Sequence, residues 1–218
     1  MEQSIRLLIV DDHPALRIGL TGLFERAPGF FVVGEACDGE EAIEKAQSLK
    51  PDVILMDLSL PKKSGLDAIK EIFLFNPKIR ILIFTASSNG EQIFAAIKAG
   101  AIGYLVKDSS AQELFSAVRN AYQGEPVLTH QLELNLIHQI QQTQTFDFPI
   151  EKLTDREVEI LCWLAQGLTN NQIAEKGCIS ECTVRSHVSN LLSKLGLENR
   201  AQAVIYAIRK GLINIILP

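Results

Sequence analysis

The stretch Asp52-Val53-Ile54-Leu55-Met56-Asp57-Leu58-Ser59-Leu60-Pro61 decides how the first part of the chain folds. Its four apolar residues, 53 to 56, are typical of a strand that is buried on both faces. The strand then ends in a carboxylate, Asp57, and in a turn that Pro61 closes. A charge directly after a buried strand indicates the edge of a sheet, where the chain emerges from the core.

Five short apolar runs alternate with amphipathic stretches between residues 5 and 122. The runs cover residues 5–10, 31–36, 53–56, 79–85 and 103–106, and the helical periods cover residues 14–27, 39–49, 65–75, 90–99 and 110–122. This alternation predicts an α/β fold with a parallel sheet covered on both faces. Right-handed crossovers then place the carboxyl ends of all five strands along one edge, where such sheets bind ligands.

The chain is predicted to hold two domains joined by a linker at residues 125–149. This linker has no Lys or Arg and contains the Gln-rich stretch 139–144. Apolar residues between 132 and 140 recur at helical spacing, so we expect part helix and part flexible tether. The first domain then covers residues 1–124 and the second residues 150–218.

The second domain has a purely helical pattern. Helices are expected over residues 155–165, 170–176, 181–195 and 199–210. Thr154 and Glu157 have the spacing of a capping box at the first of these, and a turn containing Gly177 joins two short helices. Short helices joined in this way favour a small all-α helix-turn-helix domain.

Composition is that of an ordinary globular protein, with 47% hydrophobic and 22% charged residues. No apolar run of about 18 residues exists, so we expect no transmembrane helix and no membrane partner. The N-terminus lacks a signal peptide pattern, and the four cysteines are too few and scattered for a disulfide framework. We therefore expect a cytoplasmic protein with reduced thiols.

The formal net charge of −5 conceals an uneven distribution. Residues 1–124 carry 13 Lys and Arg against 16 Asp and Glu, whereas residues 176–210 carry six against two. The second domain therefore has a modest basic surface.

Chemically reactive side chains follow four of the five predicted strands. Asp11 and Asp12 follow the first, Asp57 follows the third, Thr85 ends the fourth and Lys107 follows the fifth. Each position alone could be a cap or a turn residue, but four strand ends together indicate one site. Three close carboxylates repel one another and need a cation, and all-oxygen ligands suit Mg²⁺.

Such a site suits phosphoryl transfer. Asp57 can attack as a carboxylate nucleophile and form an aspartyl phosphate, while Mg²⁺ and Lys107 neutralise the phosphoryl oxygens and Thr85 donates a hydrogen bond. An aspartyl-phosphate phosphatase on a similar sheet is an alternative, but it would need a second acid two residues after the nucleophile. That position is Ser59.

Residues 5–122 resemble the receiver domain of two-component response regulators. The likeness rests on Asp11-Asp12, on DVILMDLSLP with the following Gly65, on FTAS around Thr85 and on GYLVKD around Lys107. The resemblance implies a flavodoxin-like sheet with strand order 2-1-3-4-5. It also implies that Asp57 accepts phosphate from a sensor histidine kinase, and that the receiver slowly loses this phosphate without being an enzyme in the usual sense.

The same resemblance implies roles for further residues. Mg²⁺ would be bound by Asp12, Asp57 and the Ser59 backbone carbonyl, with Asp11 acting through water. Thr85 would move toward the phosphoryl group while Tyr104 changes rotamer, as a two-state switch. The sequence departs from the family at Lys62-Lys63, where Gly and an apolar residue are common. These lysines are expected to be merely solvated or to alter access of the phosphodonor.

Residues 153–207 resemble the LuxR-type helix-turn-helix of the NarL/FixJ family along nearly their whole length. The helix predicted from residue 181 would enter the major groove of double-stranded promoter DNA. Arg185 and Ser186 would meet base edges, while Lys194 and Thr183 would meet phosphates. The other residues expected to contact DNA are Asn171, Gln172, Ser180 and Ser189, although an exposed polar role without a partner stays open for them.

Dimerisation is expected to accompany DNA binding. Cys182 stands where relatives often carry a basic or small polar residue, and Ser189 stands where some carry Lys. With fewer cations a single domain should bind weakly, and a phosphorylated homodimer should be required. In the family the last helix supplies the dimer contact, here Ala201, Val204 and Ile205, unless these residues are simply core.

Two other interpretations stay open. The first is a zinc or redox role for Cys178, Cys182 and His187, although these residues lack a fourth ligand and the usual zinc spacing. The second is a receiver-based adaptor that acts through protein contacts; salt-sensitive binding to duplex DNA would distinguish it from a transcription regulator.

Overall fold

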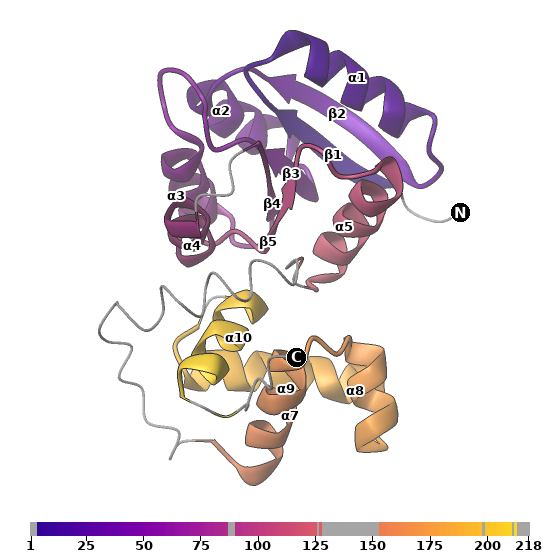
Figure 1. Ribbon diagram of the computed structural model, residues 1–218, viewed down its shortest axis with the longest axis vertical. Coiled ribbons are helices and arrows are strands. Elements are labelled where there is room, and N and C mark those ends of the chain that lie inside the picture. Colours follow the sequence, from indigo (N-terminus) through magenta and orange to yellow (C-terminus); the bar gives the residue numbers. More distant parts are fainter. Residues whose placement is uncertain are drawn as a thin grey trace. The chain divides into compact units, whose positions relative to one another are not determined.

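The computed structural model describes residues 4–86, 90–125, 127, 153–197, 199–210 and 212. The chain divides into two compact units, Met1–Thr129 and His130–Pro218 (Figure 1). Most of the predicted linker, including its expected helix, lies outside the described residues.

The first unit contains a five-stranded sheet in which every neighbouring pair is parallel. The strands are β1 (Ile5–Val10), β2 (Phe30–Ala36), β3 (Val53–Met56), β4 (Arg80–Thr85) and β5 (Gly103–Val106). Their order is β2-β1-β3-β4-β5, so the predicted order 2-1-3-4-5 is confirmed. All four residues of the central strand β3 are buried, which explains why the stretch is apolar throughout.

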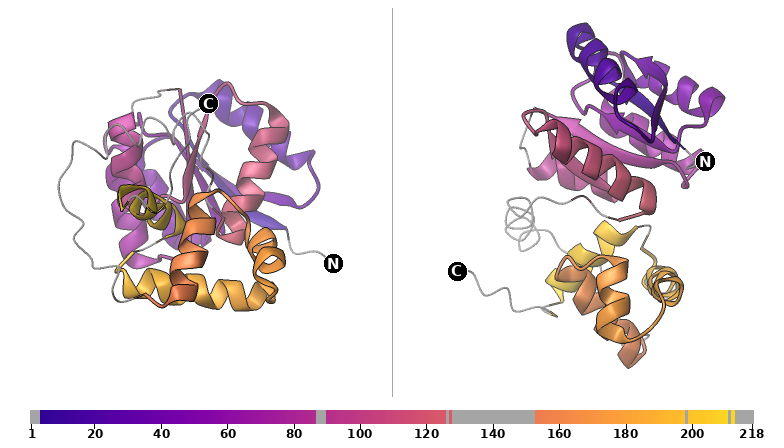
Figure 2. Two further views of the ribbon diagram at one scale, coloured as in Figure 1. Left: turned by 60° about the horizontal axis from the view of Figure 1, so that its bottom comes forward. Right: turned by 90° about the vertical axis from the view of Figure 1, so that its right-hand side faces the viewer.

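Helices cover both faces of this sheet (Figures 1 and 2). They are α1 (Pro14–Glu25), α2 (Gly39–Leu49), α3 (Gly65–Phe75), α4 (Gly90–Lys98) and α5 (Ala111–Gln123). Helices α1 and α5 share one core with the strands, in which the rings of Phe24, Phe30 and Phe115 have centroids 5.1 to 5.5 Å apart. Helices α2 and α3 pack together, as do α3 and α4, on the other face.

The structure departs from the predicted boundaries by one or two residues at several element ends. Helix α1 ends at Glu25, β2 begins at Phe30 and β4 begins at Arg80. Val127 also forms an isolated parallel bridge with Gly103, and its carbonyl accepts the Tyr104 N–H at 2.8 Å. The chain therefore still pairs with β5 just after Gly124.

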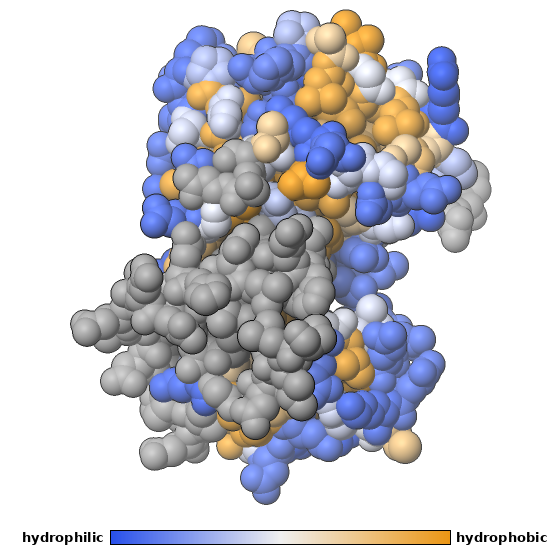
Figure 3. All heavy atoms as spheres, in the orientation of Figure 1, coloured by the Kyte–Doolittle hydropathy of each residue, from blue (hydrophilic) through white to orange (hydrophobic). Residues whose placement is uncertain are grey.

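Strand β2 forms one edge of the sheet, and apolar side chains are exposed there. Ile18 on α1 is 70% exposed and Phe31 on β2 is 58% exposed. Figure 3 shows apolar side chains gathered over α1 and β2 in the first unit. The surface formed by α1 and β2 therefore exposes large apolar side chains at this edge of the sheet.

The second unit is helical over its described residues. It contains α7 (Asp155–Ala165), α8 (Asn170–Gly177), α9 (Glu181–Lys194) and α10 (Arg200–Arg209). Capping boxes begin α7 at Thr154 and α8 at Thr169, and the Ser180 hydroxyl caps α9. The helices share a core that contains Trp163. No helix in the described ranges of either unit is long and apolar enough to cross a membrane.

Candidate functional site

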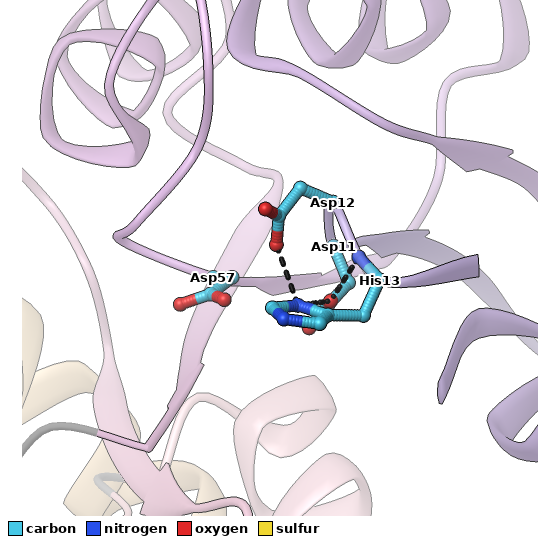
Figure 4. Close-up of side chains that lie close together, drawn as sticks. All are labelled: Asp11, Asp12, His13 and Asp57. Carbon is cyan, nitrogen blue, oxygen red and sulfur yellow. Dashed lines mark hydrogen bonds and ion pairs between the residues drawn. The ribbon is translucent and has the colours of Figure 1, made fainter. Parts of the chain in front are cut away.

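Four side chains at the carboxyl edge of the sheet lie close enough to hold one cation. Asp11, Asp12, His13 and Asp57 each offer a ligand atom, and these atoms all lie within 4.8 Å of one another (Figure 4). The backbone places the two innermost acids, because the Asp11 N–H donates to Ala36 O at 3.1 Å and the Asp57 N–H donates to Val10 O at 2.9 Å. Both carboxylates are almost completely buried.

Lys107 joins the two buried carboxylates. Its Nζ lies 2.6 Å from Asp11 Oδ2 and 2.5 Å from Asp57 Oδ2. Burial alone would lower the pKa of Lys107, but its bonds to Asp11 and Asp57 outweigh this effect and raise the pKa. Lys107 is therefore held as a cation where it can neutralise a negatively charged group on Asp57.

The carboxylate oxygens fit a divalent cation. Asp11 Oδ2 and Asp12 Oδ1 are buried, and within the described structure each meets a single nitrogen, Lys107 Nζ at 2.6 Å and His13 Nδ1 at 2.7 Å. A buried anionic oxygen carries a desolvation cost that one partner offsets only in part, so a bound cation would stabilise both carboxylates. Hard oxygen ligands of this kind suit Mg²⁺ better than softer metals.

His13 belongs to this cluster, although no role was predicted for it from the sequence. Its Nδ1 lies 3.1 Å from Asp11 Oδ1 and 2.7 Å from Asp12 Oδ1. His13 occupies the N-cap position of α1, and its side chain makes no capping bond. Its position directly after two acids at a strand end was the signal that could have identified it.

Thr85 and Tyr104 are buried on the neighbouring strands β4 and β5. Burial raises the pKa of the Tyr104 hydroxyl, and the Asp108 charge adds to this effect. The Ser59 N–H donates to Asp57 Oδ1 at 3.2 Å, so the loop after β3 orients the carboxylate. The metal-binding role of the Ser59 carbonyl and the switch roles of Thr85 and Tyr104 stay predictions.

The two lysines of the β3–α3 loop are paired, and the expectation that they are merely solvated was wrong. Lys62 Nζ lies 2.6 Å from Asp38 Oδ2, and Lys63 Nζ lies 2.6 Å from Glu71 Oε1. The Glu41 backbone N–H and the Lys62 ammonium together lower the pKa of the buried Asp38. Lys62 therefore ties the loop that follows the nucleophile to the start of α2.

Helix α9 presents polar side chains on its exposed face. Thr183, Arg185, Ser186 and Ser189 are exposed, whereas Val184 and Leu191 are fully buried. Two of the exposed side chains have partners on the same helix. Arg185 lies 2.5 Å from Glu181 Oε1, and the Ser186 hydroxyl donates to Cys182 O at 3.1 Å.

Several residues predicted to contact DNA also have structural roles. The Ser180 hydroxyl accepts the Thr183 N–H at 3.1 Å, and Gln172 completes the capping box of α8. Asn171 Nδ2 donates to Glu175 Oε1 at 3.4 Å. Lys194 is bound to the buried Glu157, with 2.7 Å between Nζ and Oε2, so it connects α9 to α7 and is not a freely solvated cation.

The structure describes only part of the predicted dimer surface. Val204 is 4% exposed, which agrees with the core alternative, while the side chains of Ala201 and Ile205 lie outside the description. His187 is half-buried, and Cys178 and Cys182 are exposed free thiols. No zinc cluster forms around them in the part of the chain that the structure describes.

Comparison with known proteins agrees with this arrangement. Residues 7–119 match the response regulator receiver domain, and residues 151–207 match the luxR family of bacterial regulatory proteins. The chain is 41% identical over 212 residues to the transcriptional regulatory protein LiaR of Bacillus subtilis (strain 168), which covers 96% of this chain and 100% of LiaR.

Two solved structures extend the likeness. The response regulator ChrA of a heme-sensing two-component system is 34% identical, with a TM-score of 0.53, covering 96% of this chain and 99% of ChrA. The two-component response regulator RcsB in complex with DNA is 25% identical, with a TM-score of 0.56, covering 94% of this chain and 98% of RcsB.

The fold, the acidic site and these relatives define a class: the chain belongs to the response regulators of two-component systems. Within that class it is a DNA-binding transcriptional regulator of the NarL/LuxR type, with a receiver domain followed by a LuxR-type helix-turn-helix domain. This is a family of regulators and not of catalytic enzymes. The predicted family, fold class and general function are confirmed.

Proposed function

We propose that Asp57 is the phospho-acceptor of this response regulator and that a sensor histidine kinase is the donor. The observation that carries the proposal is the convergence of Asp11, Asp57 and Lys107 at the carboxyl edge of the sheet. An Asp57 oxygen attacks the phosphorus of the phosphohistidine. An O–P bond forms while the N–P bond of the donor breaks, and the imidazole keeps the bonding electron pair.

The cation for this step is proposed to be Mg²⁺. Asp11, Asp12 and Asp57 would hold it with the Ser59 carbonyl, and the closeness of the three carboxylates, whose ligand atoms lie within 4.8 Å of one another, supports this assignment. When bound, Mg²⁺ neutralises charge on the phosphoryl oxygens and on the acids. Lys107, directly after β5, supplies a second positive charge and stabilises the phosphorylated product.

Phosphorylation is proposed to change the DNA affinity of the second domain. Thr85 and Tyr104 lie on β4 and β5 beside the acidic site, and their buried side chains can move only if the packing changes. A two-state rearrangement there would control formation of a homodimer in the cytoplasm. The dimer would bind promoter DNA through Arg185 and the other exposed residues of α9, as the RcsB–DNA complex supports.

Phosphate mapping tests the assignment of Asp57. The purified protein, given Mg²⁺ and acetyl phosphate, is expected to gain one acyl phosphate that survives acid and is lost in base. Asp57→Ala should abolish the modification, whereas the control Asp52→Ala, changed at the other end of β3, should retain it. Continued labelling of Asp57→Ala at the wild-type level would contradict the proposal.

A further inference from the structure

The first unit has a pocket of about 390 Å³ at the opposite end of the sheet from Asp57. Lys50 and Asp52 line it from the segment before β3, and Asn76 and Lys78 line it from the segment before β4. Arg80, the first residue of β4, and Tyr122 on α5 complete the wall. A pocket of this size can hold a small organic ligand.

The cations of this pocket are unusual for this domain because they lack partners. Most Lys and Arg side chains between residues 4 and 125 contact a carboxylate, a carbonyl or an aromatic ring. Within these described residues, Arg26, Lys50, Lys78 and Arg80 have no such partner, and the last three line the pocket. Three unpaired positive charges therefore face one cavity in a domain that is acidic as a whole.

Arg80 has lost part of its solvation without gaining an ion pair. Its side chain is partly buried, and burial lowers the pKa of its guanidinium with no compensating carboxylate. The pocket has one carboxylate, on Asp52, and its Oδ2 already accepts the Arg6 backbone N–H at 2.9 Å. A desolvated, unpaired guanidinium is unfavourable unless an anion binds to it.

The backbone around Lys50 does not require a lysine. Lys50 has φ 48°, a left-handed conformation at the end of α2 that favours Gly. The turn would thus be less strained with Gly, so the local fold does not explain the cation. Two ammonium groups around a planar guanidinium form a set that binds phosphate groups well.

We propose that this pocket binds a small molecule that carries phosphate groups, such as a diphosphate. Arg80 binds one phosphate through paired N–H donors, while Lys50 and Lys78 neutralise the remaining charge. The partly exposed ring of Tyr122 provides a face for a planar group attached to the phosphates. This site is distinct from the acidic site around Asp57, because the whole length of β3 separates the two positions.

Nuclear magnetic resonance of the ¹⁵N-labelled full chain tests the proposal. Pyrophosphate and ADP are titrated separately in the presence of EDTA, which prevents cation-mediated binding at the acidic cluster. Saturable shifts are expected at the amides of Asp52, Asn76 and Ile79 and not at Asp57. Tighter binding of ADP would identify a nucleotide as the source of the diphosphate, and equal binding would identify the free anion.

Substitutions complete the experiment. Arg80→Gln and Lys50→Gln should each weaken binding about tenfold or more, because each removes a charged hydrogen bond to the anion. Arg26→Gln is the matched control, since Arg26 is also unpaired but lies outside the pocket. If Arg80→Gln fails to fold, the weaker binding expected of Lys50→Gln and Lys78→Gln tests the proposal instead. Absence of saturation at millimolar pyrophosphate, or equal weakening in Arg26→Gln, would overturn the proposal.

Discussion

Gly65 determines how closely α3 approaches the phospho-acceptor. A Cβ at this position would lie 2.1 Å from the Asp57 carbonyl oxygen and 2.7 Å from Leu58 Cα, so any side chain must displace the backbone next to the nucleophile. The Gly65 N–H also donates to Leu58 O at 3.2 Å, which closes the loop. Lack of space, and not an unusual φ, is therefore the reason for glycine here.

Gly65→Ala is expected to lower the free energy of unfolding by about 1 to 3 kcal/mol through overpacking, and to slow phosphorylation of Asp57. Urea denaturation followed by circular dichroism measures the first effect. Gly22→Ala is the matched control, because nothing lies within 4 Å of its added Cβ and helix propensity predicts a gain of about 0.5 to 1 kcal/mol. Equal stability of the two variants would contradict the steric argument.

Glu41 gives the first unit a pH-dependent contribution to stability. Its bonds from the Lys45 ammonium and the Cys37 backbone N–H, both 2.7 Å long, lower the pKa of this carboxyl from 4.5 to about 2. A lowered folded-state pKa stabilises the fold above the unfolded-state pKa, and this stabilisation disappears as the pH falls through the folded-state value. The relevant window is therefore between pH 4.5 and about 2.

Glu41→Gln should lower the free energy of unfolding by about 1 kcal/mol at pH 7, because solvent screening reduces the value of a partly exposed pair. The difference from wild type should shrink as the pH falls below 4.5. Denaturant titrations at pH 7 and pH 3 measure this difference in the free energy of unfolding. Glu40→Gln, at an exposed neighbouring position, is the control. A difference that stays constant over this range would argue against the proposed pairing.

At the residue scale, the sequence predicted the acids but not their partners. Asp11, Asp12 and Asp57 follow strands directly, so topology alone brings them to one edge. The partners of Lys62 and Lys194 could not be predicted, since Asp38 and Glu157 are 24 and 37 residues away in the chain. Such ion pairs depend on how separate loops and helices pack, which periodicity does not report.

At the element scale, an ion pair between Lys194 and Glu157 connects α9, the proposed recognition helix, to the rest of its domain. The Glu157 side chain is only 6% exposed and completes the capping box of α7. Its pKa is lowered, because the bonds from Lys194 and Thr154 outweigh burial, which alone would raise it. The ion pair therefore connects the end of α9 to the start of α7.

Lys194→Ala is expected to destabilise the second domain by about 1 to 2 kcal/mol, because it leaves the buried Glu157 without its cation. Trp163, the single tryptophan of the chain, lies in the core of this domain, so its fluorescence during urea unfolding reports the change. Arg185→Ala is the control, since the exposed pair with Glu181 should contribute less than about 0.5 kcal/mol. A larger loss of stability in Arg185→Ala than in Lys194→Ala would contradict the view that the buried ion pair contributes more than the exposed one.

Most elements were predictable because their ends carry local signals. Ser and Thr caps precede α3, α5, α7, α8 and α9, and the apolar runs give the strands. The register shift between Leu7 and Leu8, where β1 pairs with β2, was not predictable. It depends on how the two strands align, and neither strand contains that information alone.

At the scale of the whole molecule, each unit has a composition and a pattern of its own. This is why the sequence predicted both the α/β receiver and the helical DNA-binding domain, which the family matches confirm. The connection between them could not be derived in the same way. The helical spacing between residues 132 and 140 covers only a small part of it, and the Gln-rich stretch 139–144 has no comparable pattern; both lie outside the described residues.

Phosphorylation of Asp57 at the strand end is proposed to control the binding of DNA by α9. The most direct test measures the affinity of the full chain for a duplex selected from random DNA, with and without acetyl phosphate and Mg²⁺. We expect the phosphodonor to raise the affinity of the wild type by about tenfold or more, as typical allosteric coupling energies allow, and to leave Asp57→Ala unchanged. An equal rise in both proteins, or no rise in fully phosphorylated wild type, would contradict the account.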